Sequence, residues 1–340
     1  MEQHLLSEGD LLDEFGNLQE AGYAFSLVKK YQRNKIKAGK LRIKEWDYYY
    51  IGNDKYGVAL TIADNSYMSL ASVSVLSYVR KKQVTKSYMG AFSLGKLNLP
   101  SSSCDGNVKY EGRNFTMSFE NKNGVRHLVC SMNNVYKTDK FTCDIKLEPT
   151  TDKSMVIATP FDKPKHFYYN QKINLLKASG SFSFGDRTYS LDDSIGILDW
   201  GRGVWTYKNT WYWSSLNAQQ DGHYIGFNLG YGFGDTSSAS ENMFFYDKEA
   251  YKLNDVIFDI PVDAEGKEEY LKEWKIYSRD NCIDLSFTPI LNRAADSNVF
   301  IIRSNQNQVF GKFNGTIKVG DKKYEIKNLV GFAEKVYNKW

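Results

Sequence analysis

The chain has few of the residues on which the common metal and redox sites depend. Its 340 residues include four cysteines and four histidines, with no Cys-x-x-Cys pair and no cysteine at zinc-finger spacing from a histidine. This pattern disfavours zinc motifs, so we expect neither a metal nor a cofactor. Cys130 and Cys143 fall on neighbouring predicted strands. We expect them to be small core residues and not a disulfide.

Prolines, blocks of charge and long apolar runs are also scarce. No apolar run approaches the roughly 20 residues of a membrane helix, so no integral membrane segment is expected. The net charge of +4 is spread over short clusters such as Lys29-Lys30 and Arg80–Lys82. Such clusters are typical of solvated strand ends and do not indicate a nucleic-acid surface. Residues 1–10 lack the apolar centre of a secretory signal, which favours a reducing cytoplasm.

Aromatic residues, by contrast, make up 15% of the chain. Together with frequent turn residues they favour strands over helices. From residue 41 onward, alternating segments separated by Asn, Asp and Gly predict about eight antiparallel strands by residue 150, enough to close a small barrel. The same patterning resumes after a proline-rich stretch at residues 149–164. We predict an all-β protein with an irregular arm (1–40) and two lipocalin-like barrel or curved-sheet lobes (41–155 and 165–340).

The most unusual segment, Leu198–Trp213, holds four of the seven tryptophans. Beyond a Gly-Arg-Gly break its residues alternate, which predicts a strand at 204–214. A hairpin with residues 222–232, across a polar loop at 215–221, would give one almost wholly aromatic face. If Ser214 pairs with Gly222, the facing pairs are Trp213 with His223, Trp211 with Ile225, Asn209 with Phe227, Tyr207 with Leu229, and Trp205 with Tyr231. A register slip by one residue would change all of these partners.

This aromatic face is either the packed core of a barrel or the wall of a pocket for an apolar ligand. Nearby ionisable groups favour a pocket, because carboxylates and imidazoles move protons and indoles stabilise cations. Asp199 and Arg202 precede the strand, and His223 lies at its far end. A structural ion pair between Asp199 and Arg202 is an equal alternative. His166 would transfer protons if it points into the same cavity, and would otherwise cap a surface loop.

The glycine-rich segment Gly230–Asp235 precedes another predicted strand and not the helix that a dinucleotide site requires. We therefore expect bulges or barrel corners there. The adjoining residues 240–242 offer polar groups for a pocket rim. No Ser-His-Asp, HExxH or nucleophile-elbow pattern is present, which disfavours the common hydrolases.

Motifs along nearly the whole chain resemble the family called domain of unknown function 2804. They are Ile43–Tyr49, His166–Asn170, Asp199–Trp205, Trp211–Trp213, Gly226–Gly230 and Gly331–Val336. That family has no established activity, so the resemblance implies no catalytic assignment. A more distant likeness to calycin-like proteins of the hydroxyneurosporene synthase and tocopherol cyclase types implies tandem barrels. It also implies an isoprenoid or polyketide ligand changed by addition, isomerisation or cyclisation without a metal.

Three functions remain open from the sequence. The first is a cofactor-free lyase, isomerase or cyclase acting on a hydrophobic small molecule, whose catalytic residues would be His166, Asp199, Arg202 and Glu334. The second is a non-catalytic lipocalin-like protein that binds a lipid-like or aromatic ligand, and the third is a purely structural core. In the first two, the ligand-binding residues would be Trp205, Lys208, Asn209, Trp211, Trp213, His223, Asn228 and Tyr231. Arg202 and Lys208 would orient polar groups of a substrate.

Overall fold

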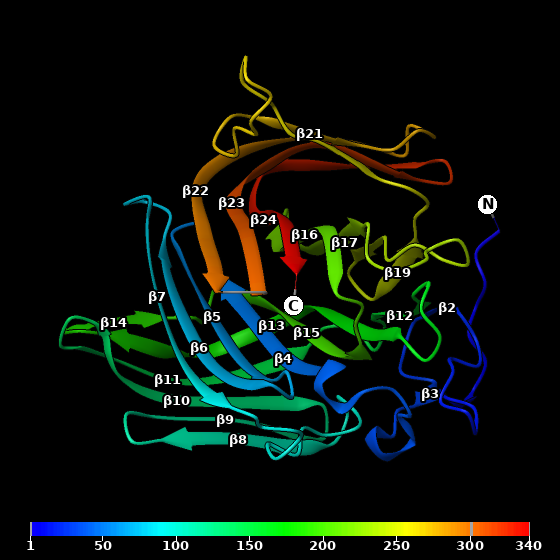
Figure 1. Cartoon of the computed structure of the whole chain (residues 1–340). Helices are drawn as coiled ribbons and strands as arrows, with labels where there is room; N and C mark the ends of the chain where they lie inside the picture. The colour runs from blue at the N-terminus through cyan, green and yellow to red at the C-terminus, as the bar shows by residue number, and fades with distance from the viewer. Residues whose placement is uncertain (1, 300–301, 340) are drawn as a thin grey trace.

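The computed structural model describes residues 2–299 and 302–339. Apart from two short 3-10 helices, η1 (Arg33–Lys35) and η2 (Lys40–Arg42), the regular elements of this part of the chain are β-strands. No helix in the described residues is long and apolar enough to cross a membrane. The predicted all-β class is confirmed, with two large curled antiparallel sheets that face each other (Figure 1).

The first sheet has thirteen strands, all from the first 204 residues. Its main path runs β7-β6-β5-β4-β15-β13-β11-β10-β9-β8, and β2, β12 and β14 pair beside it. The strands are β2 (Gly22–Ala24), β4 (Ile43–Gly52), β5 (Tyr56–Asp64), β6 (Met68–Ser77), β7 (Lys82–Ala91), β8 (Gly106–Gly112), β9 (Phe115–Lys122), β10 (Val125–Tyr136), β11 (Asp139–Pro149), β12 (Met155–Pro160), β13 (Phe167–Phe184), β14 (Arg187–Ser190) and β15 (Ile195–Val204).

The second sheet has nine strands in the order β19-β18-β17-β16-β24-β23-β22-β21-β20. They are β16 (Lys208–Gln220), β17 (His223–Tyr231), β18 (Met243–Tyr246), β19 (Glu249–Lys252), β20 (Ile257–Asp259), β21 (Trp274–Tyr277), β22 (Ile283–Val299), β23 (Ile302–Val319) and β24 (Lys322–Lys339). In Figure 1, β22 and β23 reach from this sheet towards the first. In the N-terminal arm, β1 (Gly9–Asp10) and β3 (Lys29–Lys30) form a separate parallel pair.

The predicted meander between residues 41 and 150 is confirmed, since β4–β7 and β8–β11 pair with their sequence neighbours. Cys130 and Cys143 lie opposite each other as buried free thiols. The predicted crossing at 155–165, however, lies inside the first sheet. Its prolines belong to the end of β12 and the loop to β13, and these two strands pair as a hairpin. The chain passes to the second sheet at residues 205–207.

Alternation along the strands gives each sheet one face for its own core and one for the opposite sheet. On β15, Trp200 packs in the first core, whereas Asp199 faces a cavity between the sheets. On β16, Leu216 packs in the second core, whereas Trp211 and Trp213 face that same cavity. The face between the sheets therefore contains Asp199, Trp211 and Trp213.

The hairpin of the tryptophan run is confirmed, but its predicted register is wrong. β16 continues through the expected loop to Gln220, which pairs with His223, so Trp213 pairs with Gly230 and not with His223. The reason is the Asp221-Gly222 pair, whose φ angles of 53° and 84° suit the tight two-residue turn of a twisted hairpin. The predicted strand 204–214 is also interrupted, because β15 ends at Val204 and β16 begins at Lys208.

Candidate active site

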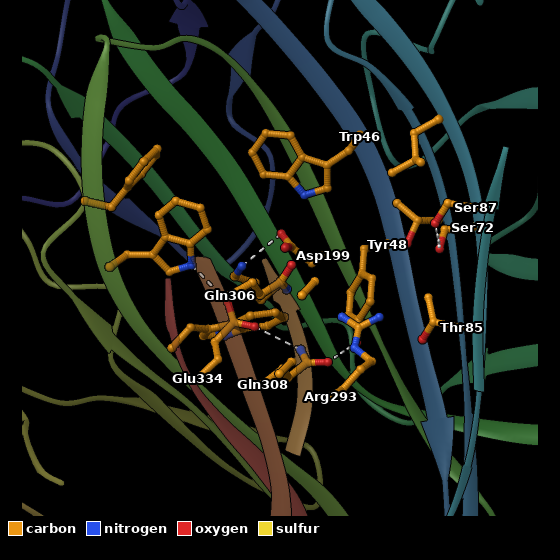
Figure 2. A pocket seen from close by; sticks show the side chains of 18 of the residues that line it. Trp46, Tyr48, Ser72, Thr85, Ser87, Asp199, Arg293, Gln306, Gln308 and Glu334 are labelled. Carbon is orange, nitrogen blue, oxygen red and sulfur yellow. Dashed lines mark hydrogen bonds and ion pairs between the residues drawn. The ribbon is translucent and has the colours of Figure 1, made fainter. Parts of the chain in front are cut away.

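A cavity of about 320 Å³ lies between the two sheets, within the range of small-molecule sites. Strands β4–β7, β13 and β15 of the first sheet line it, and so do β16 and β22–β24 of the second. Figure 2 shows the polar side chains of Asp199, Glu334, Gln308 and Arg293 converging from these strands. The cavity is therefore built from segments far apart in the sequence.

One wall of the cavity is a continuous aromatic cluster. The Trp205 ring packs edge-on against Trp46 and Trp211, with centroids 5.2 and 5.8 Å apart. Phe233 contacts both Trp205 and Trp211, at 4.7 and 5.3 Å. Tyr168 lies parallel to Trp46 and edge-on to Phe233. Such rings fix each other in place and exclude water from whatever lies against them.

Trp46 reaches this wall because Gly201, its partner on β15, has no side chain. A Cβ atom at Gly201 would lie 2.0 Å from Cζ2 of the Trp46 indole. The Gly-Arg-Gly segment, predicted as a break, is thus part of a regular strand. Its first glycine provides the space into which the indole packs.

Substituting Gly201 with alanine is therefore expected to displace the Trp46 indole and to destabilise the protein by about 1–3 kcal/mol through overpacking. Chemical denaturation followed by circular dichroism measures the loss, and tryptophan fluorescence reports the displaced ring. Gly39→Ala is the matched control, since a Cβ at Gly39 would meet nothing within 4 Å. Equal stability of the two variants would contradict this account of the Gly201–Trp46 contact.

Lys172 and Asp199 form a buried ion pair at the cavity, with Nζ and Oδ1 2.9 Å apart. Asn170 Nδ2 also donates to Asp199 Oδ1, at 2.6 Å. The Lys172 ammonium lies 3.8 Å from the centroid of the Trp213 ring, a distance at which a cation is attracted by the ring face. The charges of Lys172 and Asp199 largely cancel. The Lys172 ammonium covers one face of the Trp213 ring.

Glu334 on β24 is the carboxyl best arranged for proton transfer. Trp211 Nε1 donates to its Oε1 at 2.9 Å, and Gln308 Nε2 donates to its Oε2 at 3.0 Å. Its side chain is 3% exposed, and this burial raises the pKa of Glu334 to about 7, against the opposing effects of the Trp211 hydrogen bond, Arg293 and Lys172. A carboxyl group that titrates near neutrality can both donate and accept a proton.

Glu241 is a second buried carboxyl on the cavity wall, and burial raises its pKa as well. Gly230 on β17 makes room for it, since a Cβ there would lie 2.6 Å from the Glu241 Oε1 atom. Gly230 pairs regularly with Trp213 and is not at a bulge. The polar stretch 240–242 thus contributes a residue to the cavity.

The opposite side of the cavity is polar but mostly uncharged. Ser72 and Ser87 on β6 and β7 share a hydrogen bond of 2.9 Å, and Thr85 lines the wall beside them. Tyr48 donates from its hydroxyl to Gln308 Oε1 at 3.4 Å. Burial raises the pKa of Tyr48 to about 12, so its hydroxyl remains a donor at neutral pH.

Of the predicted catalytic residues, Asp199 and Glu334 meet in this cavity, whereas His166 and Arg202 do not line it. His166 is buried and donates from Nδ1 to the Pro164 carbonyl at 2.9 Å. Burial lowers the pKa of His166. Arg202 points into the first core and pairs with Asp47 at 3.0 Å. It forms a structural ion pair, as the alternative reading expected, but with a different carboxylate from Asp199.

Of the predicted ligand-binding residues, Trp205, Trp211 and Trp213 line the cavity. Asn228 supports it from behind, because its Oδ1 accepts a 2.7 Å hydrogen bond from Trp213 Nε1. The others lie elsewhere. Lys208 is exposed, Asn209 donates to the Thr206 carbonyl, His223 pairs with Asp247 on the surface, and Tyr231 stacks on Tyr212 at the second core. The corrected hairpin register moves His223 and Tyr231 away from the tryptophans.

The groups of the site that sequence reasoning missed include Trp46, Lys172 and Arg293, whereas Glu241 lies in the stretch expected to supply polar groups at a pocket rim. Trp46 lies within a motif that resembles the family. Tyr168, Asn170 and Lys172 occupy every second position of β13. They therefore lie on one face of the strand, and this alternation can be recognised in the sequence. Arg293 has no local signal, because only the pairing of β22 with β23 brings it to the cavity.

Comparisons with known proteins agree with this architecture. The family model described as domain of unknown function (DUF2804) matches residues 2–340. No curated protein matches the sequence. The chain is similar to the structure of a putative AttH from Nitrosomonas europaea, with 11% identity and a TM-score of 0.54, over 90% of this chain and 96% of that one. It is also similar to kievitone hydratase from Nectria haematococca, with 13% identity and a TM-score of 0.50, over 87% and 88%. At these identities the likeness shows a shared fold.

Proposed function

The chain belongs to the DUF2804 family, and from its cavity we propose that it is a cofactor-free enzyme that transfers a proton to or from a hydrophobic small molecule. The reaction class is addition, elimination, isomerisation or cyclisation. The observation that carries the proposal is Glu334, a buried carboxyl on the wall of an aromatic cavity, whose burial raises its pKa to about 7. Both its oxygens are held by fixed donors, so its orientation towards the cavity is set before a ligand binds.

The other groups have supporting roles in this proposal. Glu334 protonates a double bond or removes a proton, and Glu241 is available for the complementary step. The faces of Trp46, Trp205 and Trp211 stabilise positive charge that develops on the substrate. Trp213 has a different role from the one its sequence position suggests, because Lys172 already covers its ring. The Lys172–Asp199 pair orients the substrate in place of Arg202 and Lys208.

The similarity to kievitone hydratase is compatible with this reaction class, since the name of that protein denotes the addition of water. It does not identify the substrate. The size of the cavity, about 320 Å³, and its aromatic wall favour a compact apolar or aromatic molecule.

The test begins with solvent extraction of the purified protein and identification of any bound molecule by mass spectrometry. That molecule is then incubated with the protein in D2O. We expect conversion or deuterium incorporation, and a loss of at least about a hundredfold in rate for Glu334→Gln, the usual scale of a lost general acid or base. The rate should change near pH 7 in the wild type and not in the variant.

Glu325→Gln is the matched control, because Glu325 is an exposed glutamate on the same strand. It should retain the wild-type rate. Equal rates for Glu334→Gln and Glu325→Gln would refute the role of Glu334. A molecule that binds and returns unlabelled and unconverted from the wild-type protein would instead support the alternative, a lipocalin-like binding protein that uses the same aromatic wall.

A further inference from the structure

Arg293 on β22 is a cation of the cavity whose hydrogen-bonding capacity is not used up. Its Nη1 donates to Ser74 Oγ on β6 at 2.9 Å, which ties β22 to the first sheet. Its Nε is buried and meets no acceptor among the described residues. Lys172, the other cation on the wall, is paired with Asp199. No ion pair joins Arg293 to a carboxylate within the part of the chain that the structure describes.

The arrangement of its neighbours makes Arg293 part of a connected polar group. Figure 2 shows Arg293 close to Tyr48 and Gln308, and its positive charge opposes the rise that burial causes in the pKa of both Tyr48 and Glu334. Tyr48 donates to Gln308, which in turn donates to Glu334. A hydrogen-bonded path therefore leads from Tyr48, beside the guanidinium, to the carboxyl proposed for proton transfer.

We propose that Arg293 is the anion-binding group of the cavity and that the substrate is an apolar molecule bearing a carboxylate. This inference rests on the function proposed above and names the substrate class for the same site. The carboxylate would lie against Arg293 and Tyr48, and the apolar part against Trp205 and Trp211. A guanidinium presents parallel N–H donors that match the two oxygens of a carboxylate.

The charges in the cavity are consistent with this assignment. Lys172 and Asp199 cancel as an ion pair. The other two carboxyls, Glu241 and Glu334, have raised pKa values because they are buried. The ion-pair partner that Lys172 has in Asp199 is one that Arg293 lacks among the described residues, and a substrate carboxylate would supply it. The buried Nε of Arg293 has no acceptor among the described residues, and an anionic ligand would supply one.

Two fluorescent probes of matched shape test the proposal. 8-Anilinonaphthalene-1-sulfonate carries an anionic group that N-phenyl-1-naphthylamine lacks. We expect the wild type to bind the sulfonate probe about tenfold more tightly, the scale of one charge-assisted hydrogen-bonded contact. Arg293→Gln should abolish this preference and leave the affinity for the neutral probe unchanged. Naphthalene-1-acetate should displace the sulfonate probe from the wild type, and naphthalene-1-acetamide should not.

Arg303→Gln is the matched control, because Arg303 is an exposed arginine on the same hairpin and the charge change is identical. It should keep the preference, whereas Arg293→Lys should keep only part of it. Equal binding of both probes by the wild type, or an unchanged preference in Arg293→Gln, would overturn the proposal. The deuterium experiment on Glu334 can fail independently, so loss of anion preference and loss of catalysis are distinguishable.

The pH dependence of probe binding gives a second readout. The charged groups acting on Glu334 include Arg293 from β22, Lys172 from β13 and Asp199 from β15, and the titratable hydroxyls of Tyr48 from β4 and Tyr168 from β13 also interact with it. Ionisation of Glu334 above pH 7 adds a negative charge that competes with the ligand for Arg293. Since the sulfonate is charged at every pH used, affinity for it should fall severalfold between pH 6 and pH 8 in the wild type. Glu334→Gln should remove this fall, and its persistence there would exclude Glu334 as the coupled group.

Discussion

Replacing Arg202 by methionine is expected to lower the free energy of unfolding by about 3–5 kcal/mol, the usual cost of breaking a buried ion pair by removing one partner. The Arg202 side chain is fully buried and pairs with Asp47. It also donates to the carbonyl oxygens of Trp46, at 2.7 Å, and Pro100, at 2.9 Å. Its loss leaves Asp47 buried without its counter-ion and the two carbonyls without this donor. Urea denaturation followed by circular dichroism measures the change.

Two further variants separate the charge from the packing. Arg202→Lys keeps the positive charge but cannot reach all these acceptors, so we expect a smaller loss. Adding Asp47→Asn to Arg202→Met removes the stranded carboxylate, and the double variant should be more stable than the sum of the two single losses predicts. Additive losses would contradict a direct Arg202–Asp47 interaction. Cavity binding of the neutral naphthylamine probe by Arg202→Lys should be preserved, because Arg202 does not line the cavity.

The strands of the first sheet could be predicted because the information is local. Period-two alternation and Asn, Asp and Gly turns identify β4–β11 from the sequence alone. The division between the sheets could not be predicted in this way. The prolines near residue 160 belong to a loop within the first sheet, whereas the actual crossing at 205–207 contains no turn signal and lies inside the tryptophan run.

Only part of the site could be predicted from the sequence, for a related reason. Asp199, Glu334 and three tryptophans could be chosen from composition and motif, but their partners come from strands paired over long distances. The sequence itself does, however, separate Arg202 from Asp199. Asp199 and Arg202 are three residues apart, so on a continuous strand they face opposite sides. The interpretation of Gly201–Gly203 as a break concealed this, and the close packing of Trp46 on Gly201 explains the glycine instead.

The Glu334→Gln variant is expected to differ from the wild type in a strongly pH-dependent way. Folding raises the pKa of Glu334 from its usual 4.5 to about 7. A raised carboxyl pKa means that the folded state binds the proton more tightly than the unfolded state. The stability that this tighter proton binding by Glu334 gives to the folded state is therefore complete below pH 4.5 and is lost as the pH rises to 7. The pKa shift corresponds to about 3 kcal/mol of pH-dependent stability. The glutamine variant lacks this pH dependence, because glutamine does not titrate.

We therefore expect Glu334→Gln to be less stable than the wild type at pH 5, by about 1 kcal/mol for altered hydrogen bonds to Trp211 and Gln308. At pH 8 the order should reverse, so that the variant is the more stable protein. Urea midpoints measured from pH 4.5 to 8.5 give the difference, in which the titration of other groups such as Glu241 largely cancels. Glu325→Gln, changed at an exposed position, should give a flat difference. A flat difference for Glu334→Gln would mean that this carboxyl titrates at its ordinary pKa, and with it the proposed acid–base role at neutral pH would fall.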